Sequence, residues 1–331
     1  MLKVIVGILF AALVTTAVGY HQLQITISST LLVPANTQFE VKKGMGFNQL
    51  CQQWQANKWL ESCLKFQLIA KLDPTLTDLK AGLYLLDSTT VLNNIRRINQ
   101  GKQVSFSFTI IEGQMLRDVL TTVAKTPHLR QDLNIDNLSQ QILNADQHLE
   151  GWLYPDTYHY HANDSASGLL KRAYSTMQMT LDEAWQQRAD DLPLNSAYEA
   201  LILASIIEKE TGLASERPMI ASVFTNRLNS KMRLQTDPTV IYGLGTAYDG
   251  DIKRKDLTSY TPYNTYRIPG LPPTPIAMPS KAAILAAVNP PESDYVYFVA
   301  KGDGSHQFSK TLKAHNKAVQ DYLRYQQQLS N

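Results

Sequence analysis

The sequence has almost no net charge, with 31 Lys and Arg residues against 29 Asp and Glu residues in 331. Proteins that bind nucleic acid carry an excess or a local stripe of positive charge, and this chain has neither, so we expect no nucleic-acid partner. The Cys and His spacing of a zinc site is also missing, since His159 and His161 have no further ligand beside them. The Gly302-Asp303-Gly304 turn opens no helix, as a phosphate-binding loop would. We therefore expect neither a metal nor a cofactor.

Cysteine is scarce, because the chain contains only Cys51 and Cys63. Both residues fall in the first folded segment, in two neighbouring predicted helices. In an oxidising compartment such a pair can form a bridge between the helices. Two buried thiols explain the same residues equally well, so the sequence leaves both states open.

The one long hydrophobic run stands at the N-terminus. Val4–Gly19 contains no charged residue and is just short of a full membrane span. Lys3 precedes the run and the next permanently charged basic residue is Lys42, which predicts an N-terminus in the cytoplasm and a body in the periplasm. Ala17-Val18-Gly19 could instead end a cleavable signal peptide. Because the run is longer than most signal-peptide cores, we favour a retained inner-membrane anchor over residues 1–20.

A small module is predicted after the anchor. Residues 21–36 are polar and rich in Ser and Thr, which is typical of a linker, and residues 37–103 read as alternating strands and helices. The predicted order is strand, helix, helix, strand and helix, over residues 38–43, 47–54, 59–70, 79–86 and 91–98. Two strands around two helices, with an exposed edge that bears aromatic residues, resemble a LysM-type glycan-binding module. A plain structural subdomain would have the same order.

Residues 104–331 predict a helix-rich domain that ends in a β-hairpin, so the fold class is α+β. Its central helix lies within residues 195–213. Ser196 and Glu199 form a capping box at the start, and Gly212 is placed to close the end.

Glu210 stands out within this helix. At about 100° per residue it falls near the middle of the apolar stripe, whereas Glu208 points to the opposite side. A carboxyl group on a buried face resists ionisation, which suits a general acid near neutral pH. A position in the last turn, beside solvent or an Arg partner, would explain Glu210 without any function.

Two further acidic residues lie in segments that would suit a sugar ligand. Asp237 precedes Pro238, which fits a helix N-cap, although its carboxylate could instead face Glu210. Asp156 lies in residues 149–158, a stretch dense in aromatic residues and turn formers. Aromatic rings beside carboxylates are a common way to grip sugars. A tight loop packed by its own rings is the alternative.

The longer motifs of the chain form a recognisable set. They are Glu150-Gly151 and residues 155–158, 204–211, 215–217, 221–228, 232–243, 263–266, 270–273, 297–300 and 315–316. Together they resemble the endolytic murein transglycosylases of the YceG-like (MltG) family, from about Phe39 to the C-terminus. Thr274 departs from the pattern, because the family usually has glycine at this position.

The resemblance implies that Glu210 is the catalytic acid and base, with Glu208 in a supporting structural role. The implied reaction cuts the β-1,4 bond between N-acetylmuramic acid and N-acetylglucosamine within peptidoglycan strands, without water, and leaves a 1,6-anhydro end. Such chemistry needs one acid/base and not the two carboxylates of a hydrolase. We expect the following residues to line the glycan groove: Gln235, Thr236, Asp237, Tyr263, Asn264, Tyr266 and Asp156.

By the same resemblance the protein would end the growth of nascent strands beside peptidoglycan synthases. Two other functions stay open. A lysozyme-like hydrolase would add water to the same bond, with Asp156 or Asp237 as a second carboxylate. A non-catalytic, peptidoglycan-binding scaffold would not require the carboxyl group of Glu210.

Overall fold

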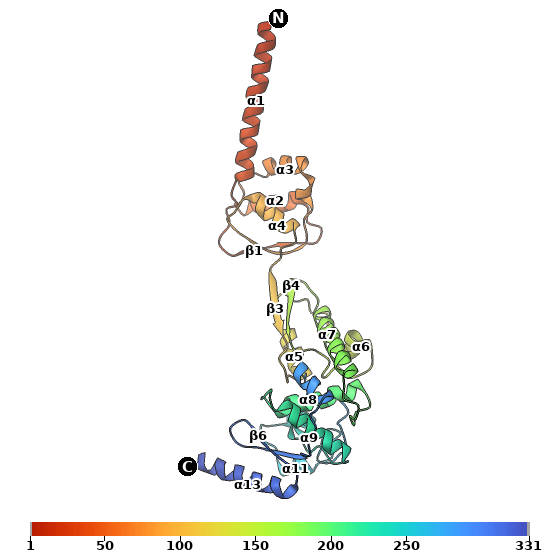
Figure 1. Ribbon diagram of the computed structural model, residues 1–331. Coiled ribbons are helices and arrows are strands. Elements are labelled where there is room, and N and C mark those ends of the chain that lie inside the picture. Colours follow the sequence, from red (N-terminus) through yellow and green to blue (C-terminus); the bar gives the residue numbers. More distant parts are fainter. Residues whose placement is uncertain (1, 330–331) are drawn as a thin grey trace. The chain divides into compact units, whose positions relative to one another are not determined.

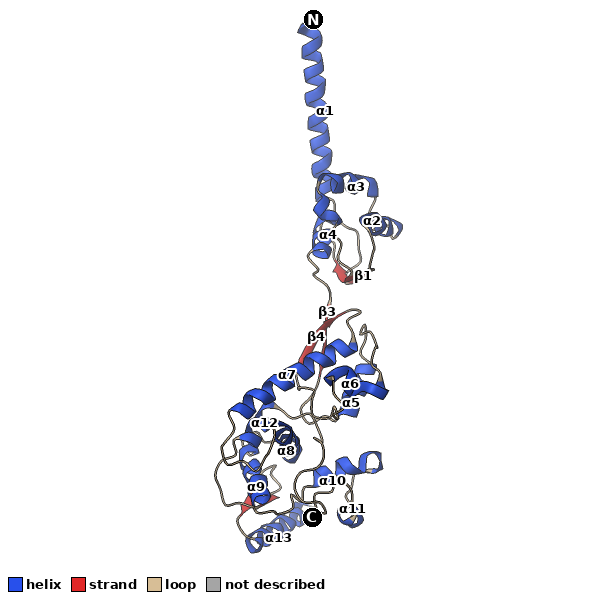
Figure 2. Ribbon diagram, turned by 90° about the vertical axis from the view of Figure 1, so that its right-hand side faces the viewer, coloured by secondary structure: helices blue, strands red, loops and turns tan. Residues whose placement is uncertain are grey.

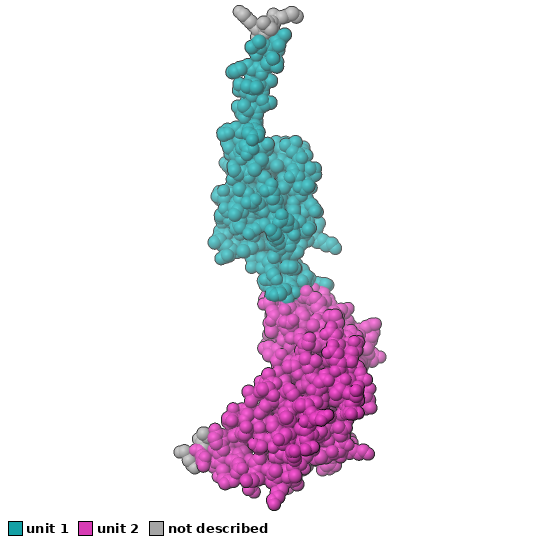
Figure 3. All heavy atoms as spheres, in the orientation of Figure 1, with its two compact units in different colours: residues 1–106, 128–130, 159–164 teal, residues 107–127, 131–158, 165–331 magenta. Residues whose placement is uncertain are grey.

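The computed structural model describes residues 2–329, and the chain divides into two compact units (Figure 3). Unit 1 contains the chain up to residue 106 together with 128–130 and 159–164, and unit 2 contains residues 107–127, 131–158 and 165 onwards. Within the described residues, helices predominate and the strands form two-stranded sheets (Figure 1). This mixture of helices and small sheets confirms the α+β prediction.

The N-terminal helix α1 (Leu2–Ser28) is long and apolar enough to cross a membrane, by its length and composition. The apolar side chains of residues 4–20 are exposed, and a bilayer would cover them while the helix satisfies its own backbone groups. The helix continues past the predicted anchor, so the start of the linker predicted for residues 21–36 is helical. Leu31 and Val33 are buried in the core of unit 1, which corrects the end of that linker to a part of the module.

Unit 1 has the predicted order of strand, helix, helix, strand and helix. Its elements are β1 (Thr37–Val41), α2 (Phe47–Ala56), α3 (Cys63–Leu72), β2 (Gly82–Leu86) and α4 (Val91–Asn99). The two strands are antiparallel, with Phe39 opposite Tyr84. Trp54 is fully buried and its ring lies 5.9 Å from that of Phe39, so these aromatic residues form core and not an exposed edge. The likeness to a LysM-type module therefore stays a prediction.

Cys51 and Cys63 are joined by a disulfide that connects α2 with the start of α3. Their Cα atoms are 5.6 Å apart, which is within the usual range for a bridge. Of the two states that the sequence left open, the structure has the bridged one. The bridge closes a short loop, which reduces the freedom of the unfolded chain.

Helix α8 (Ala197–Glu210) is the centre of unit 2. It packs against α7 (Ala166–Gln186), α9 (Arg217–Asn229) and α12 (Lys281–Val288), as Figure 2 shows. The hydroxyl of Ser196 accepts a hydrogen bond from the backbone N–H of Glu199, which confirms the predicted start. The end differs, because Thr211 follows in an extended conformation and Gly212 is not a left-handed cap.

Further short helices and a second pair of strands lie along the chain between α4 and the C-terminal hairpin. They are α5 (Leu116–Ala124), α6 (Leu138–Leu143), α10 (Asp237–Leu244) and α11 (Arg254–Thr258), with β3 (Ser105–Thr109) paired with β4 (Thr157–His161). Short 3₁₀ turns cover Pro74–Thr77, Ile135–Asn137 and Gly245–Ala247. Helix α10 contacts α8, and this contact brings residues 234–237 to the end of α8.

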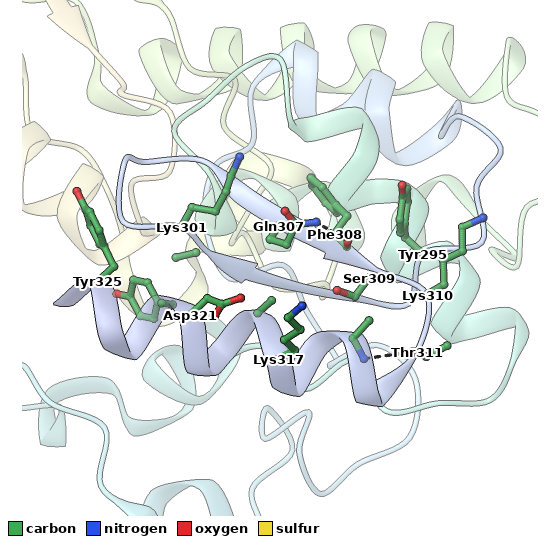
Figure 4. A pocket seen from close by; sticks show the side chains of 14 residues that line it. Tyr295, Lys301, Gln307, Phe308, Ser309, Lys310, Thr311, Lys317, Asp321 and Tyr325 are labelled. Carbon is green, nitrogen blue, oxygen red and sulfur yellow. Dashed lines mark hydrogen bonds between the residues drawn. The ribbon is translucent and has the colours of Figure 1, made fainter. Parts of the chain in front are cut away.

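The C-terminal part is a hairpin followed by a helix, as predicted. The hairpin is β5 (Tyr297–Ala300) with β6 (His306–Ser309), and α13 (Leu312–Leu329) packs on it. A cavity of about 740 Å³ lies between the hairpin and α13, with aromatic and lysine side chains on its walls (Figure 4). Asp321, the acidic residue of this cavity, pairs with Arg324 at 2.5 Å and is exposed, so it is no candidate for acid/base catalysis.

Candidate active site

Glu210 lies at the last turn of α8, in a pocket of about 410 Å³. The pocket combines the end of α8 with the segment before α10, strand β5 and the start of α13. Its lining residues are Glu210, Arg227, Leu234, Gln235, Asp237, Tyr266, Tyr297, Phe298, Leu312, His315 and Asn316. Segments far apart in the sequence therefore meet around a single carboxyl group.

The carboxyl group of Glu210 is poised to exchange a proton near neutral pH. The hydroxyl of Thr236 donates a hydrogen bond to Glu210 Oε1. The pKa of Glu210 is raised to about 7, chiefly by burial and in smaller part by the nearby Asp237 carboxylate, while the hydrogen bond from Thr236 favours the charged form and opposes this rise. The more distant positive charges of Arg227 and His306 also lower this pKa. Both protonation states are therefore accessible at neutral pH, as an acid/base catalyst requires.

Thr236 is held in place by a small cluster of buried threonines. Its backbone N–H donates to Thr265 Oγ1 at 3.0 Å, and Thr239 Oγ1 lies 2.8 Å from the same oxygen. Thr239 in turn donates to the carbonyl oxygen of Thr236 at 2.8 Å. The preceding Gln235 has φ 50°, a left-handed conformation that costs a non-glycine residue on the order of 1 kcal/mol. The fold thus fixes the donor of the Glu210 hydrogen bond and accepts local backbone strain beside it.

Asp237 faces the same pocket. The hydroxyl of Tyr266 donates to Asp237 Oδ1 at 2.7 Å, and burial raises the pKa of Tyr266, so the phenol stays protonated. Helix α10 takes Thr236 as its N-cap position without a side-chain cap, and Asp237 is the first helical residue. The N-cap is therefore Thr236, one residue before the position predicted from the sequence. The sequence allowed Asp237 to be either a helix cap or a carboxylate that faces Glu210, and the geometry agrees with the second of these roles.

Glu208 is buried, contrary to its predicted position on the exposed side of the helix. Its side chain is 5% exposed, forms an ion pair of 2.9 Å with Arg217, and accepts hydrogen bonds from both the N–H and the hydroxyl of Ser280. The reason is that residues 200–207 of α8 are all buried, so this helix has no solvent face there. Glu208 joins α8 to α9 and to the N-terminus of α12, which fits the expected structural role.

Three predicted groove residues lie away from the Glu210 pocket. The amide of Asn264 is buried and donates to the carbonyl oxygens of residues 256, 257 and 259, so it organises its own loop. Tyr263 contacts the ring of Tyr242 and its hydroxyl lies 2.9 Å from Thr274 Oγ1, at the position that departs from the family pattern. Asp156 is exposed and lines a different groove.

Conversely, the pocket contains residues to which no role was assigned from the sequence. The guanidinium of Arg227 donates to the carbonyl oxygens of Val296 and Leu234 at 2.6 and 2.7 Å and lies over the ring of Tyr297, at 5.3 Å. His315 stacks on the same ring at 5.1 Å. These residues belong to motifs that were recognised in the sequence. The sequence did not show that they meet around Glu210.

A second carboxyl group with a raised pKa lies elsewhere in unit 2. Glu150 is 2% exposed, accepts hydrogen bonds from the N–H of Leu116 and the hydroxyl of Tyr242, and burial raises its pKa to about 7. Its hydrogen bonds connect the start of α5 with α10. Glu150 is not among the residues that line the Glu210 pocket. Among residues 2–329, no group of three His, Cys, Asp or Glu side chains is close enough to hold a metal ion.

The chain is similar to several known proteins. The model of the YceG-like family matches residues 39–321. The chain is 31% identical to the endolytic murein transglycosylase of Bacillus subtilis strain 168 over 309 residues, which are 86% of this chain and 84% of that protein. It is 27% identical over 367 residues to the endolytic murein transglycosylase of Streptococcus pneumoniae serotype 2, covering 97% of this chain and 65% of that protein. A crystal structure of a YceG-like protein from Listeria monocytogenes is 32% identical, with a TM-score of 0.54, and covers 85% of this chain and 98% of that one.

Proposed function

This chain belongs to the YceG-like family, and from that premise we propose that it is an endolytic murein transglycosylase. It cuts the β-1,4 bond between N-acetylmuramic acid and N-acetylglucosamine within peptidoglycan strands and forms a 1,6-anhydro end. The observation that carries the proposal is the carboxyl group of Glu210, with a pKa of about 7, in a pocket built from six separate segments of the chain. Such a group can act as acid and then as base at one pH.

Glu210 serves twice in this reaction. As general acid it gives its proton to the glycosidic oxygen, so that the bond from this oxygen to the anomeric carbon of the muramic acid breaks. As carboxylate it then accepts the proton of the same sugar's 6-hydroxyl while that oxygen bonds to the anomeric carbon. The proton is returned to Glu210 and no water is consumed. Because the nucleophile belongs to the substrate, holding the sugar in the correct orientation supplies much of the rate.

The other pocket residues suit these steps. The carboxylate of Asp237, fixed by Tyr266, stabilises the positive charge that develops on the sugar ring, since opposite charges attract strongly in a site with little water. Gln235 and Asn316 offer amide groups to the hydroxyl and acetamido groups of the glycan. Asp237 is also the residue that a hydrolase would use to activate water. The two reactions are distinguished by their products, because only hydrolysis adds water to the cleaved end.

The remaining parts of the chain fit an enzyme of nascent peptidoglycan. We infer that α1 anchors the protein in the inner membrane with its N-terminus in the cytoplasm and both units in the periplasm. From that position it would cut strands as they leave the synthases and so end their elongation. Unit 1, with its strand-helix-helix-strand order, would serve as a LysM-like module that binds glycan.

The experiment is mass spectrometry of uncrosslinked glycan strands digested by the wild type and by Glu210→Gln. We expect strands with anhydro-muramyl ends from the wild type and no cleavage by the variant, which keeps the shape of the side chain without an acidic proton. Products heavier by one water would show that the protein is a hydrolase, with Asp237 as the candidate second carboxylate. If neither protein cleaves and both bind strands, the scaffold function would replace the proposal.

A further inference from the structure

The Asp156 segment belongs to a family motif, yet the Glu210 pocket does not include it. Asp156 instead lines a separate groove of about 620 Å³ in unit 2, which we call the Asp156 groove. Its lining residues come from 109–113 and 155–157, from the end of α8 with the residues that follow it, and from Arg217. The groove therefore needs an explanation of its own.

The Asp156 groove is adjacent to the Glu210 pocket. Lys209, Thr211 and Gly212 line the groove, whereas Glu210, between them in the chain, lines the pocket. Successive Cα atoms are about 3.8 Å apart, so the two depressions lie on opposite sides of one short segment. The helix ends at Glu210 and Thr211 is extended, with φ −143° and ψ 134°. A strand of sugars that crosses this segment would occupy both depressions.

The chemistry of the groove suits a hydroxyl-rich ligand. Its walls offer the hydroxyls of Thr109 and Thr157, 2.9 Å apart, and the exposed carboxylate of Asp156. The amino group of Lys209 also lines the groove and donates to the carbonyl oxygen of Gly113 at 3.2 Å. Arg217 and Glu208 form an ion pair of 2.9 Å, so these two charges balance each other. Glu112, Asp156 and Lys209 provide charges of both signs.

We propose that the Asp156 groove is a remote glycan subsite, which binds sugars of the same strand on one side of the bond that is cut. The proposal rests on the proposed function. An enzyme that cuts inside a strand must hold sugars on both sides of the bond, and contacts far from the reacting atoms can be used to position the reacting sugar. The groove would make long strands better substrates than short ones.

The test compares short and long substrates with the full-length protein in detergent. Peptide-free glycan strands are separated into tetrasaccharides and strands several times longer, and kcat/KM is measured for each. The variants are Asp156→Asn and Lys209→Gln, and the control is Glu183→Gln, an exposed carboxylate on α7 outside the groove. Asn keeps the oxygen that accepts the N–H of Thr157, so the segment retains its local hydrogen bond.

We expect each groove variant to lower the ratio of kcat/KM for long to short strands about fivefold to tenfold, the effect of one lost hydrogen bond. The control variant should keep the wild-type ratio. Binding of long strands to Glu210→Gln should weaken by the same factor when Asp156→Asn is added, which separates binding from chemistry.

Wild-type protein that leaves all strands intact would refute the proposed function. Wild-type protein that cuts strands, with groove variants of unchanged ratio, would refute only the subsite. An equal loss on short and long strands, or a lower melting temperature, would show a structural role for Asp156 and also overturn the subsite.

Discussion

The hydrogen bond from Thr236 to Glu210 makes a direct prediction for the pH dependence of the reaction. If protonated Glu210 is the acid, the rate is constant below its pKa and falls as the pH rises through about 7. The hydroxyl of Thr236 stabilises the ionised carboxylate and so lowers this pKa. Replacing Thr236 by Val removes the donor but keeps the branched shape, and the pKa must then rise.

The size of the effect follows from the type of bond. A hydrogen bond to a charged group contributes about 1.5–3 kcal/mol, and a change of one in pKa corresponds to about 1.4 kcal/mol. We therefore expect the alkaline limb of the profile to move from about pH 7 to about pH 8 or higher in Thr236→Val. The maximal rate should fall about tenfold, because the carboxylate loses the bond that orients it for its second step.

The assay is the initial rate of anhydro-muramyl product formation across pH, with the full-length protein in detergent. Thr225→Val is the matched control, because Thr225 on α9 is also buried and its hydroxyl has no hydrogen-bond partner among the described residues. An alkaline limb that stays in place in Thr236→Val, or that moves equally in Thr225→Val, would refute the assignment of this limb to Glu210.

Three predictions concern stability. Glu208→Gln leaves the 8% exposed Arg217 without its closest carboxylate, which should cost about 3 kcal/mol and lower the melting temperature of unit 2 by on the order of 10 °C in calorimetry. Glu150 has a raised pKa of about 7 in the fold, so its contribution to stability is complete below pH 4.5 and is lost as the pH rises through 7. In denaturant titrations Glu150→Gln should remove about 3 kcal/mol of the fall in stability over this range, while the fall due to Glu210, whose pKa is also about 7, should remain. Reduction of the Cys51–Cys63 bridge should destabilise unit 1 by about 3 kcal/mol, seen as faster limited proteolysis there and an unchanged rate in unit 2.

Elements with a local signal could be predicted from the sequence. The start of α8 depends on Ser196 and Glu199, which are three residues apart, and capping acts over that distance. The C-terminal hairpin follows from alternating residues around a glycine turn, and the strand-helix-helix-strand order of unit 1 follows from short periodic segments. The apolar run of α1 needs no tertiary partner to be recognised.

Glu208 is a residue whose burial could not be predicted from helical periodicity. A helical wheel separates an exposed face from a buried one, but neighbours cover α8 on all sides over residues 200–207. Whether a carboxylate there is structural or reactive depends on what meets it. Arg217 and Ser280 pair with Glu208, whereas a threonine and a second carboxylate meet Glu210.

The sequence by itself determined the membrane-length helix and the α+β class, and it singled out Glu210 as the candidate acid and base. Only the tertiary structure decided which partners surround this residue. It brought Arg227, Tyr297 and His315 to the pocket and left Asn264 in its own loop. The physical reason is the distance along the chain over which each kind of interaction acts. Capping, periodicity and turn formation act within a few residues, whereas the pocket joins segments up to about a hundred residues apart, whose meeting depends on the packing of the whole unit.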